Sequence, residues 1–190
     1  MDQILEEIRF VVLDVETTGF YPEKDRICEI SMAALKNLEV VNSFTSLVNP
    51  GIEIPYSVFK VHGIDNDMVA RSPSFEEIAN IVMDFISESV LVGHNIEFDF
   101  SFLKEEMQRA GYNIGDFLLI DTVVLSRKLY SIGNYKLQTV AKHLNIYSDT
   151  FHRAEKDVEV TVKIFQNIIR LLQDEYGIKS LREIFEFIKG

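Results

Sequence analysis

The strand predicted at residues 9–16 constrains the fold more than any other feature of the sequence. It reads Arg-Phe-Val-Val-Leu-Asp-Val-Glu and is apolar on both faces until Asp14. A β-rich segment of this kind is typical of a central strand that is covered on each side. Asp14 and Glu16 end the strand. Because side chains two residues apart leave the same face, their carboxylates are expected to converge where the core meets solvent.

The remaining pattern predicts a mixed sheet flanked by helices, in the α/β or α+β class. Strands at 9–16, 27–35 and 40–48 form an antiparallel meander. Ser74 and Glu77 have capping-box spacing ahead of an apolar stripe of helical period, which predicts a helix, whereas residues 51–72 are predicted as a loop. The other predicted elements are strands at 90–92 and 117–120, helices at 98–110, 122–129, 136–144 and 154–175, and a short helix opened by Ser180 and Glu183.

The length of 190 residues predicts one domain, spanning 1–190, that can bury its own core. No apolar run approaches the roughly 18 residues of a membrane span. The N-terminus has neither the basic nor the apolar region of an export signal. We therefore expect a protein of the reducing cytoplasm without a membrane partner. Cys28 is the single cysteine, and its strand-like surroundings indicate a small buried apolar side chain rather than a reactive thiol.

The charge balance is acidic, with 19 basic and 30 acidic residues and a formal net charge of −11. This sign opposes binding to nucleic-acid phosphates, so either the partner is not nucleic acid or cations mediate the contact. The segment from Arg127 to Lys156 differs, with six basic residues against two acidic ones. Its interspersed aromatic residues are Tyr130, Tyr135, Tyr147 and Phe151. Two interpretations stay open for this segment, a track for a nucleic-acid strand or a pair of solvated helix faces.

The carboxylates of Asp14 and Glu16 form the first candidate site. Their Cα atoms are expected about 6.5 to 7 Å apart, and like charges this close need a cation or a proton between them. Oxygen ligands of this kind suit Mg²⁺ or Mn²⁺. Acids at strand ends also commonly face water, so the pair alone does not establish a site.

Asp99 and Asp157 are further candidates, each in the first turn of a predicted helix. A carboxylate at that position also stabilises the positive end of the helix dipole, which is the ordinary structural explanation. His152 precedes Asp157 on a predicted loop, where a solvated imidazole is equally ordinary. Taken singly, none of these residues indicates chemistry.

The order of the motifs changes this assessment. The chain contains Asp14-Val15-Glu16-Thr17-Thr18-Gly19, then His94-Asn95-x-x-Phe98-Asp99, then Asp121-Thr122, then His152-Arg153-Ala154-x-x-Asp157. With these motifs it resembles the DEDDh family of 3′→5′ exonucleases over residues 10–172, and is most similar to the proofreading exonuclease subunits and domains of bacterial replicative DNA polymerase III. Two further segments resemble the family, Val61-His62-Gly63-Ile64 and Asp121-Thr122-x-x-Leu125-Ser126.

The resemblance implies a ribonuclease H-like fold, an α/β mixed five-stranded sheet with three antiparallel and then two parallel strands, flanked by helices. It also implies that Asp14, Glu16, Asp99 and Asp157 hold two divalent cations, Mg²⁺ or Mn²⁺, and that His152 is the general base. Two such ions stabilise the attacking and leaving oxygens of a phosphoryl displacement, and an imidazole can take a proton near neutrality. The residues implied to contact substrate are Thr17, Thr18, Gly19, Val61, His62, Asn95 and Phe98; for Phe98, core packing is an alternative.

The implied function is removal of 3′-terminal nucleotides from single-stranded or frayed DNA, as proofreading for a replicative polymerase that would be the protein partner. An acidic domain binds free DNA weakly, so attachment to a polymerase would supply the effective concentration. Two alternatives stay open: an exonuclease of the same family acting on RNA or short oligonucleotides, or a non-catalytic module that braces a polymerase. A phosphoacceptor domain, which also uses acids at strand ends with Mg²⁺, does not account for the element from His152 to Asp157.

Overall fold

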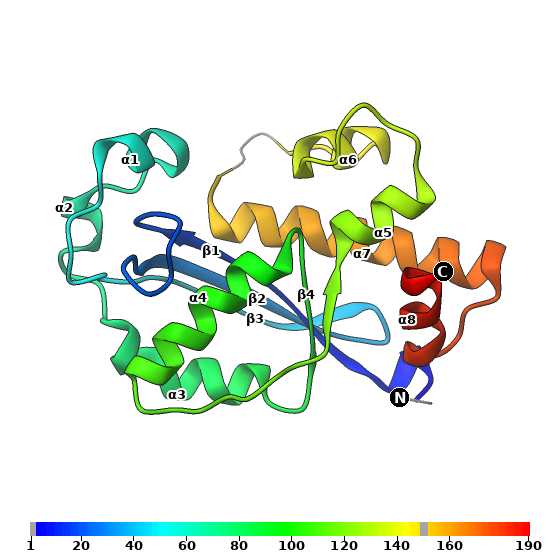
Figure 1. Ribbon diagram of the computed structural model, residues 1–190, viewed down its shortest axis with the longest axis horizontal. Coiled ribbons are helices and arrows are strands. Elements are labelled where there is room, and N and C mark those ends of the chain that lie inside the picture. The colour runs from blue at the N-terminus through cyan, green and yellow to red at the C-terminus, as the bar shows by residue number, and fades with distance from the viewer. Residues whose placement is uncertain (1–2, 149–151) are drawn as a thin grey trace.

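A five-stranded sheet forms the centre of the computed structural model, which describes residues 3–148 and 152–190 (Figure 1). The strand order is β3-β2-β1-β4-β5. β1 pairs antiparallel with β2, β2 pairs antiparallel with β3, and β4 and β5 continue the sheet in parallel. The strands are β1 (Arg9–Thr17), β2 (Ile27–Lys36), β3 (Glu39–Leu47), β4 (Val90–Gly93) and β5 (Leu119–Asp121). This arrangement confirms the predicted sheet and places the acidic strand β1 at its centre.

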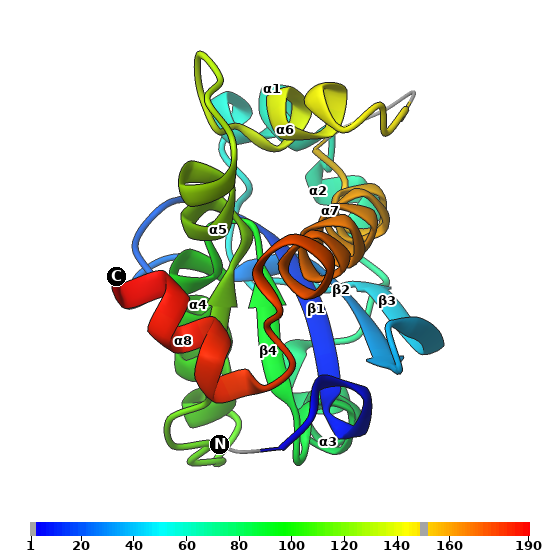
Figure 2. The ribbon, with the colours of Figure 1, turned by 90° about the vertical axis from the view of Figure 1, so that its right-hand side faces the viewer.

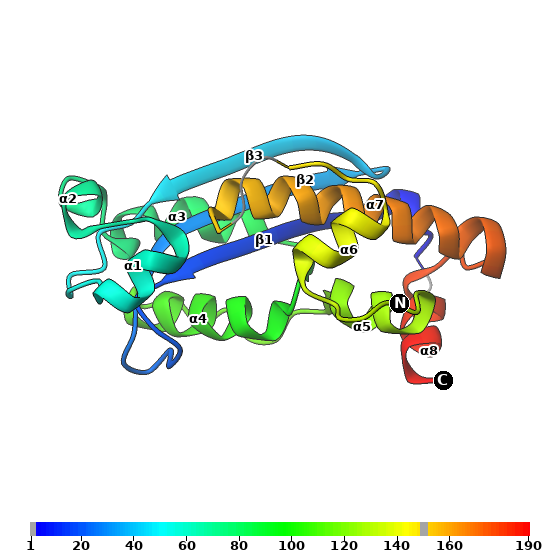
Figure 3. The same ribbon diagram turned by 90° about the horizontal axis from the view of Figure 1, so that it is seen from above.

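Eight α-helices accompany the sheet among the described residues, after a short 3₁₀ helix at Leu5–Glu7. They are α1 (Tyr56–His62), α2 (Asn66–Val69), α3 (Phe75–Ile86), α4 (Ile96–Arg109), α5 (Thr122–Leu129), α6 (Leu137–His143), α7 (Ala154–Tyr176) and α8 (Leu181–Lys189). Helices α1 and α6 lie on either side of the start of α7 (Figures 1 and 3). None of the helices within residues 3–148 and 152–190 has the length and apolar character that a membrane span requires.

Two apolar cores cover the two faces of the sheet, because successive β1 side chains point to opposite sides. Phe10 and Val12 pack with α7 and α8 in one core, while Val11 and Leu13 pack with α3 and α4 in the other. Figure 2 shows α8 beside α5 on the side of the sheet that α7 covers. Burial on both faces explains why β1 lacks the alternating pattern of a half-exposed strand.

The capping signals in the sequence are confirmed. Ser74 and Glu77 form a capping box at the start of α3, and Ser180 and Glu183 form another at the start of α8. In each box the serine hydroxyl accepts a backbone N–H and the glutamate accepts one in return, so two otherwise unpaired donors are satisfied.

The prediction of a loop from residue 51 to 72 was wrong, because α1 and α2 lie there. Pro55 precedes α1, and Asp65 caps α2 by accepting the Met68 N–H at 2.8 Å. Both helices are short, and helices of this length owe their stability to tertiary packing rather than to a long apolar period. A second difference is the start of α4 at Ile96 rather than at residue 98.

Candidate active site

Three carboxylates from two distant parts of the chain meet at the end of β1. Asp14 and Glu16 lie on β1, and Asp157 lies in the first turn of α7. One ligand oxygen from each lies within 4.8 Å of the others. We call these three residues the acidic cluster. The pleat of β1 explains the first two positions, and the packing of α7 against β1 brings in the third.

Asp99 lies next to the acidic cluster but is not one of its three members. It is buried in the first turn of α4, and its Oδ1 accepts the backbone N–H of Val15 at 2.9 Å. Val15 stands between Asp14 and Glu16, so this bond ties the start of α4 to the acidic end of β1. The structure thus brings together three of the four acids that the sequence predicts and holds the fourth beside them.

Electrostatics sets these acids apart from ordinary surface carboxylates. Removal from water, with Asp99 and Glu16 nearby, raises the pKa of Asp14 well above its usual value. Burial, followed by the charge of Asp157, raises the pKa of Glu16 to about 8. Burial also raises the pKa of Asp99 to about 7, against the bond from Val15, and raises that of Asp157. Such a group favours protons or cations because burial disfavours the charged carboxylates, which also repel one another.

Asp157 has one oxygen anchored and one without a partner. Its Oδ2 accepts the backbone N–H of His152 at 3.1 Å. Its Oδ1 is buried and makes no hydrogen bond to any described residue. A buried carboxylate oxygen without a donor is costly. An atom of this kind beside two other carboxylates suits a metal cation.

The His152 side chain is exposed and lies at the edge of the same site. Its backbone is left-handed, with φ 65°, and its Nε2 is 3.4 Å from Gln138 Nε2. A cavity of about 350 Å³ is lined by Lys136, Leu137, Gln138, His152 and Asp157. The predicted base therefore shares a cavity with one carboxylate of the acidic cluster. Sequence reasoning did not single out Gln138 for this cavity, because nothing in the chain marks it.

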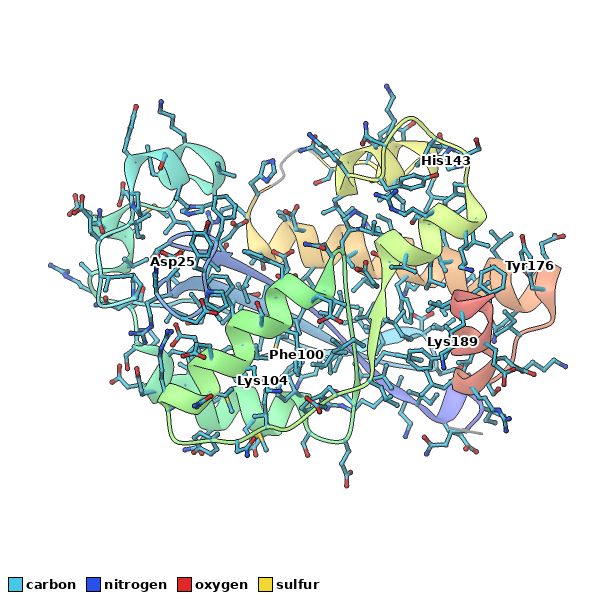
Figure 4. All side chains as sticks on the ribbon, viewed as in Figure 1. Asp25, Phe100, Lys104, His143, Tyr176 and Lys189 are labelled. Atoms are coloured by element: carbon cyan, nitrogen blue, oxygen red, sulfur yellow. The ribbon has the colours of Figure 1, made fainter. Side chains whose placement is uncertain are left out.

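The turn after β1 is held tightly. Thr17 and Thr18 are buried; the Thr17 hydroxyl donates to Gly19 O at 2.6 Å, and the Thr18 N–H donates to Arg26 O at 2.9 Å. A Cβ on Gly19 would overlap the carboxylate of Asp25, which Figure 4 places in this loop. The close packing explains why glycine stands at this position.

A second cavity, of about 200 Å³, is bordered by Glu16. It is lined by Val15, Glu16, Thr17, Gly19, Phe20, Ser57, Val58, Val61, His62 and Phe98. Five of the predicted substrate residues share it: Thr17, Gly19, Val61, His62 and Phe98. Phe20 was missed by sequence reasoning; its signal is a large aromatic residue after a turn glycine, left 76% exposed. Ser57 and Val58 were missed because they lie on α1, where a loop was predicted.

Two of the predicted residues have clear structural bonds. His62 is buried; its Nδ1 accepts the Ile64 N–H at 3.0 Å, and burial lowers its pKa. Asn95 has a left-handed backbone with φ 77°, and its N–H donates to Asp121 Oδ1 at 3.0 Å. Asp121 thereby joins the β4–α4 turn to the end of β5. Phe98 packs on the Phe102 ring at a centroid distance of 5.0 Å while also lining the second cavity.

The basic segment from Arg127 to Lys156 divides into several environments. Arg127 lies over the Tyr135 ring, Arg153 pairs with Glu29, and Lys156 pairs with Glu159. Lys136 lines the cavity of His152, whereas Lys142 is exposed on α6. Asp149 and Phe151, which belong to this segment, lie outside the described residues.

Comparisons with known proteins agree with one another. A family model described as "Exonuclease" (RNase_T) matches residues 11–165. "DNA polymerase III PolC-type" of Caldanaerobacter subterraneus subsp. tengcongensis is 41% identical over 179 residues, covering 94% of this chain and 13% of the relative. "3'-5' exonuclease DinG" of Bacillus subtilis is 38% identical, covering 93% of this chain and 19% of the relative. The chain thus spans less than a fifth of these two relatives.

Solved structures share the fold. "Exonuclease X in complex with 5' overhanging duplex DNA" has a TM-score of 0.72 at 23% identity, covering 94% of this chain and 99% of the other. E. coli exonuclease I in complex with a dT13 oligonucleotide has a TM-score of 0.79 at 16% identity, covering 95% of this chain and 43% of the other. Likeness at this level of identity shows the fold, which is ribonuclease H-like.

Proposed function

The chain belongs to the exonuclease family matched over residues 11–165, and on that premise we propose that it is a metal-dependent 3′→5′ exonuclease acting on DNA. The single observation that carries the proposal is the acidic cluster. Asp14 and Glu16 are far from Asp157 in the sequence, and yet one carboxylate oxygen from each residue lies within 4.8 Å of the other two. Exposed acids also cluster without a metal, but here Asp157 is buried and its Oδ1 has no partner among the described residues, so a cation would satisfy an oxygen that the protein leaves unpaired.

The residues fit divalent cations. The donors are carboxylate oxygens, which suit Mg²⁺ or Mn²⁺, and Asp157 Oδ1 is buried without a partner. We propose that Asp14, Glu16, Asp99 and Asp157 hold two such ions. When bound, the ions would offset charge on the phosphate and lower the pKa of a water molecule. Four carboxylates nearly balance two dications, so metal binding would offset the burial and the mutual repulsion that raise their pKa values.

His152 is proposed as the general base. Its ring is exposed at the cavity that Asp157 also lines, so it can accept a proton from a water molecule there. Its backbone N–H holds Asp157 Oδ2, so the same residue also fixes the orientation of a ligand carboxylate. Gln138 lies close enough to His152 to orient its ring.

The second cavity is proposed to receive the 3′-terminal nucleotide. Phe20, Val61 and Phe98 line it beside Glu16, so an apolar surface for a base adjoins the carboxylates. Thr17, Gly19 and His62 share this cavity and would contact the sugar, while Thr18 supports the turn beneath it. Asn95 lies exposed at the start of α4 and is proposed to contact the strand. Stacking on apolar and aromatic groups tolerates every base, so we expect removal without regard to sequence.

The natural setting is proposed from the relatives. One relative is a DNA polymerase of which this chain covers 13%, so residues 1–190 are proposed as an exonuclease domain that works beside a polymerase in the cytoplasm, in proofreading. Its partners would be the frayed 3′ end of DNA and the polymerase. The net charge of −11 favours tethering, because the domain gains little affinity for DNA from its own charge.

The test is a cleavage assay in which the chain is incubated with nucleic-acid strands labelled at the 5′ end, in the presence of Mg²⁺, Mn²⁺ or a chelator, and the lengths of the products are measured. We expect a ladder that shortens from the 3′ end, needs metal, and disappears in Asp14→Asn. Asp116→Asn is the matched control, because Asp116 is an exposed acid that pairs with Lys104. Single-stranded DNA, mismatched duplex ends and RNA are compared in parallel. Faster cleavage of RNA than of DNA would show that RNA is the preferred substrate. If no strand is cleaved, the proposed activity fails and the alternative of a non-catalytic module that braces a polymerase is favoured.

A further inference from the structure

Glu29 is a buried acid outside the acidic cluster. It lies on β2 directly opposite Glu16 of β1, and only 1% of the residue is exposed. Its carboxylate accepts Arg153 Nη2 at 2.6 Å and Arg153 Nε at 3.1 Å, and also the backbone N–H of Ala154 at 2.8 Å. Nothing in the proposed chemistry uses Glu29, although a buried carboxylate at this position adds a negative charge to a site already rich in them.

Among the described residues, the hydrogen bonds of the Glu29 carboxylate go to the start of α7. Arg153 is the N-cap residue, and its side chain makes no capping bond to its own helix. The first N–H groups of a helix have no partner within it. The Glu29 carboxylate, on β2, accepts the N–H of Ala154, the first residue of α7. Its negative charge also interacts favourably with the positive N-terminal end of the α7 dipole. The Glu29 carboxylate on β2 therefore caps the N-terminus of α7.

The Glu29–Arg153 pair is linked to the acidic cluster through the first turn of α7. Arg153 O accepts the N–H of Asp157 at 3.0 Å, and Asp157 Oδ2 accepts the N–H of His152 at 3.1 Å. A shift of Arg153 would therefore move the metal-ligand candidate Asp157 and the base candidate His152 together. The Glu29–Arg153 pair joins these two residues to the β1–β2 ladder that carries Asp14 and Glu16.

We infer that Glu29, together with Arg153, is a positioning residue that fixes Asp157 and His152 against the acidic end of β1. This inference rests on the proposed function. A forked pair suits such a role because the guanidinium meets both carboxylate oxygens in one geometry, whereas a lysine acts as a point charge. The Arg153 side chain is 42% exposed, and a pair of this kind is weak evidence for stability alone, since water and the removal of Glu29 from water offset most of the attraction.

The chain offers a matched control in Glu106. Its carboxylate is buried, accepts Arg26 Nε at 2.7 Å and Nη2 at 2.9 Å, and also accepts the Ile27 N–H at 3.2 Å. This pair has the same forked geometry as Glu29 with Arg153, with Arg109 Nη1 as a further donor at 3.4 Å, and its bonds to the described residues join α4 to the start of β2 without reaching α7. Glu106→Gln therefore reports the loss of a buried pair without the loss of positioning.

The experiment combines steady-state kinetics with amide hydrogen exchange by NMR on Glu29→Gln. We expect kcat to fall about 10- to 100-fold, as for other residues that orient ligands, with KM nearly unchanged. Exchange at Ala154 and Asp157 should accelerate while β1 and β2 keep their protection. Mn²⁺ affinity should fall as well. Arg153→Lys should retain more activity than Arg153→Met, and Glu106→Gln should leave kcat and the α7 amides close to those of the unaltered chain.

Two outcomes would overturn the inference. One is Glu29→Gln with unaltered kcat and unaltered exchange at Ala154. The other is accelerated exchange over the whole sheet, with Glu106→Gln losing as much kcat as Glu29→Gln, which would make the pair a general stabiliser. If the unaltered chain cleaves no strand, the proposed function fails, and Ala154 exchange together with Mn²⁺ affinity still decides whether Glu29 positions the carboxylates.

Discussion

Asp99 and Asp157 are each held by one backbone N–H, and this shared arrangement explains how helix residues become ligand candidates. Val15 donates to Asp99, and His152 donates to Asp157. An anchored carboxylate loses little conformational entropy when a cation binds, because folding has already restricted its orientation.

At the residue scale, His152→Ala should lower kcat about 10²- to 10⁴-fold, as removal of a positioned base does. Mn²⁺ affinity should be retained, because the bond to Asp157 comes from the backbone of His152. Calorimetric titration and cleavage rates measure the two effects. His143→Ala is the control, since His143 is exposed on α6 (Figure 4). A loss of Mn²⁺ affinity as large as the loss of rate would contradict the role of base.

Lys136 and Lys142 separate the two interpretations of the basic segment. Lys136 lines the cavity of His152, whereas Lys142 is exposed away from it. If Lys136 contacts a phosphate, Lys136→Glu should weaken strand binding and flatten its salt dependence by about 0.7 in the log–log slope. Lys142→Glu should leave the slope unchanged. Binding measured over a range of salt concentrations decides, and a slope unchanged from that of the unaltered chain in both variants would favour solvated helix faces.

At the scale of elements, the turn between β1 and β2 should be intolerant of bulk. Gly19→Ala places a Cβ on the Asp25 carboxylate, so this side chain must shift and lose its bond from the Tyr21 N–H, at a cost of about 1 to 3 kcal/mol. Because Gly19 also lines the second cavity, KM should rise. Urea unfolding and steady-state kinetics measure the two effects. Gly133→Ala is the control, since a Cβ there meets nothing. Unchanged stability and KM in Gly19→Ala would contradict this account of the turn.

The sequence predicts elements well where period and caps agree. β1 is recognisable because both of its faces are apolar, and α3 because its capping box precedes an amphipathic stripe. Helix α1 was missed because seven residues give too little periodicity, and its position depends on packing. Glu29 was also missed as a partner of Arg153, because the pair joins residues 124 positions apart and no local pattern encodes such a contact.

At the scale of the whole molecule, the raised pKa values predict a pH-dependent stability without metal. The pKa of Glu16 rises from 4.5 to about 8 and that of Asp99 from 3.8 to about 7. Between about pH 4 and pH 8 the folded chain therefore binds more protons at these two groups than the unfolded chain does. Stability should therefore be greatest below about pH 4 for these groups and decline until about pH 8. Carboxylates with ordinary salt bridges would give the opposite slope.

Metal should reverse this decline, since bound cations replace the protons. Thermal unfolding in chelator and in excess Mg²⁺ should diverge as pH rises from 5 to 8, with the larger Tm in Mg²⁺. Glu16→Gln should flatten the decline in chelator. A Tm in chelator that does not fall over this range, or one that Mg²⁺ raises equally at every pH, would contradict the electrostatic account of the acidic cluster.

The most direct test of the central claim is anomalous diffraction from crystals of the chain grown with Mn²⁺ and a nucleoside 5′-monophosphate. We expect two Mn²⁺ peaks among Asp14, Glu16, Asp99 and Asp157, with the phosphate between the two ions and the base beside Phe20. Crystals of Asp14→Asn should lose at least one peak. Ordered Mn²⁺ elsewhere in the chain, with these four carboxylates free of metal, would contradict the claim.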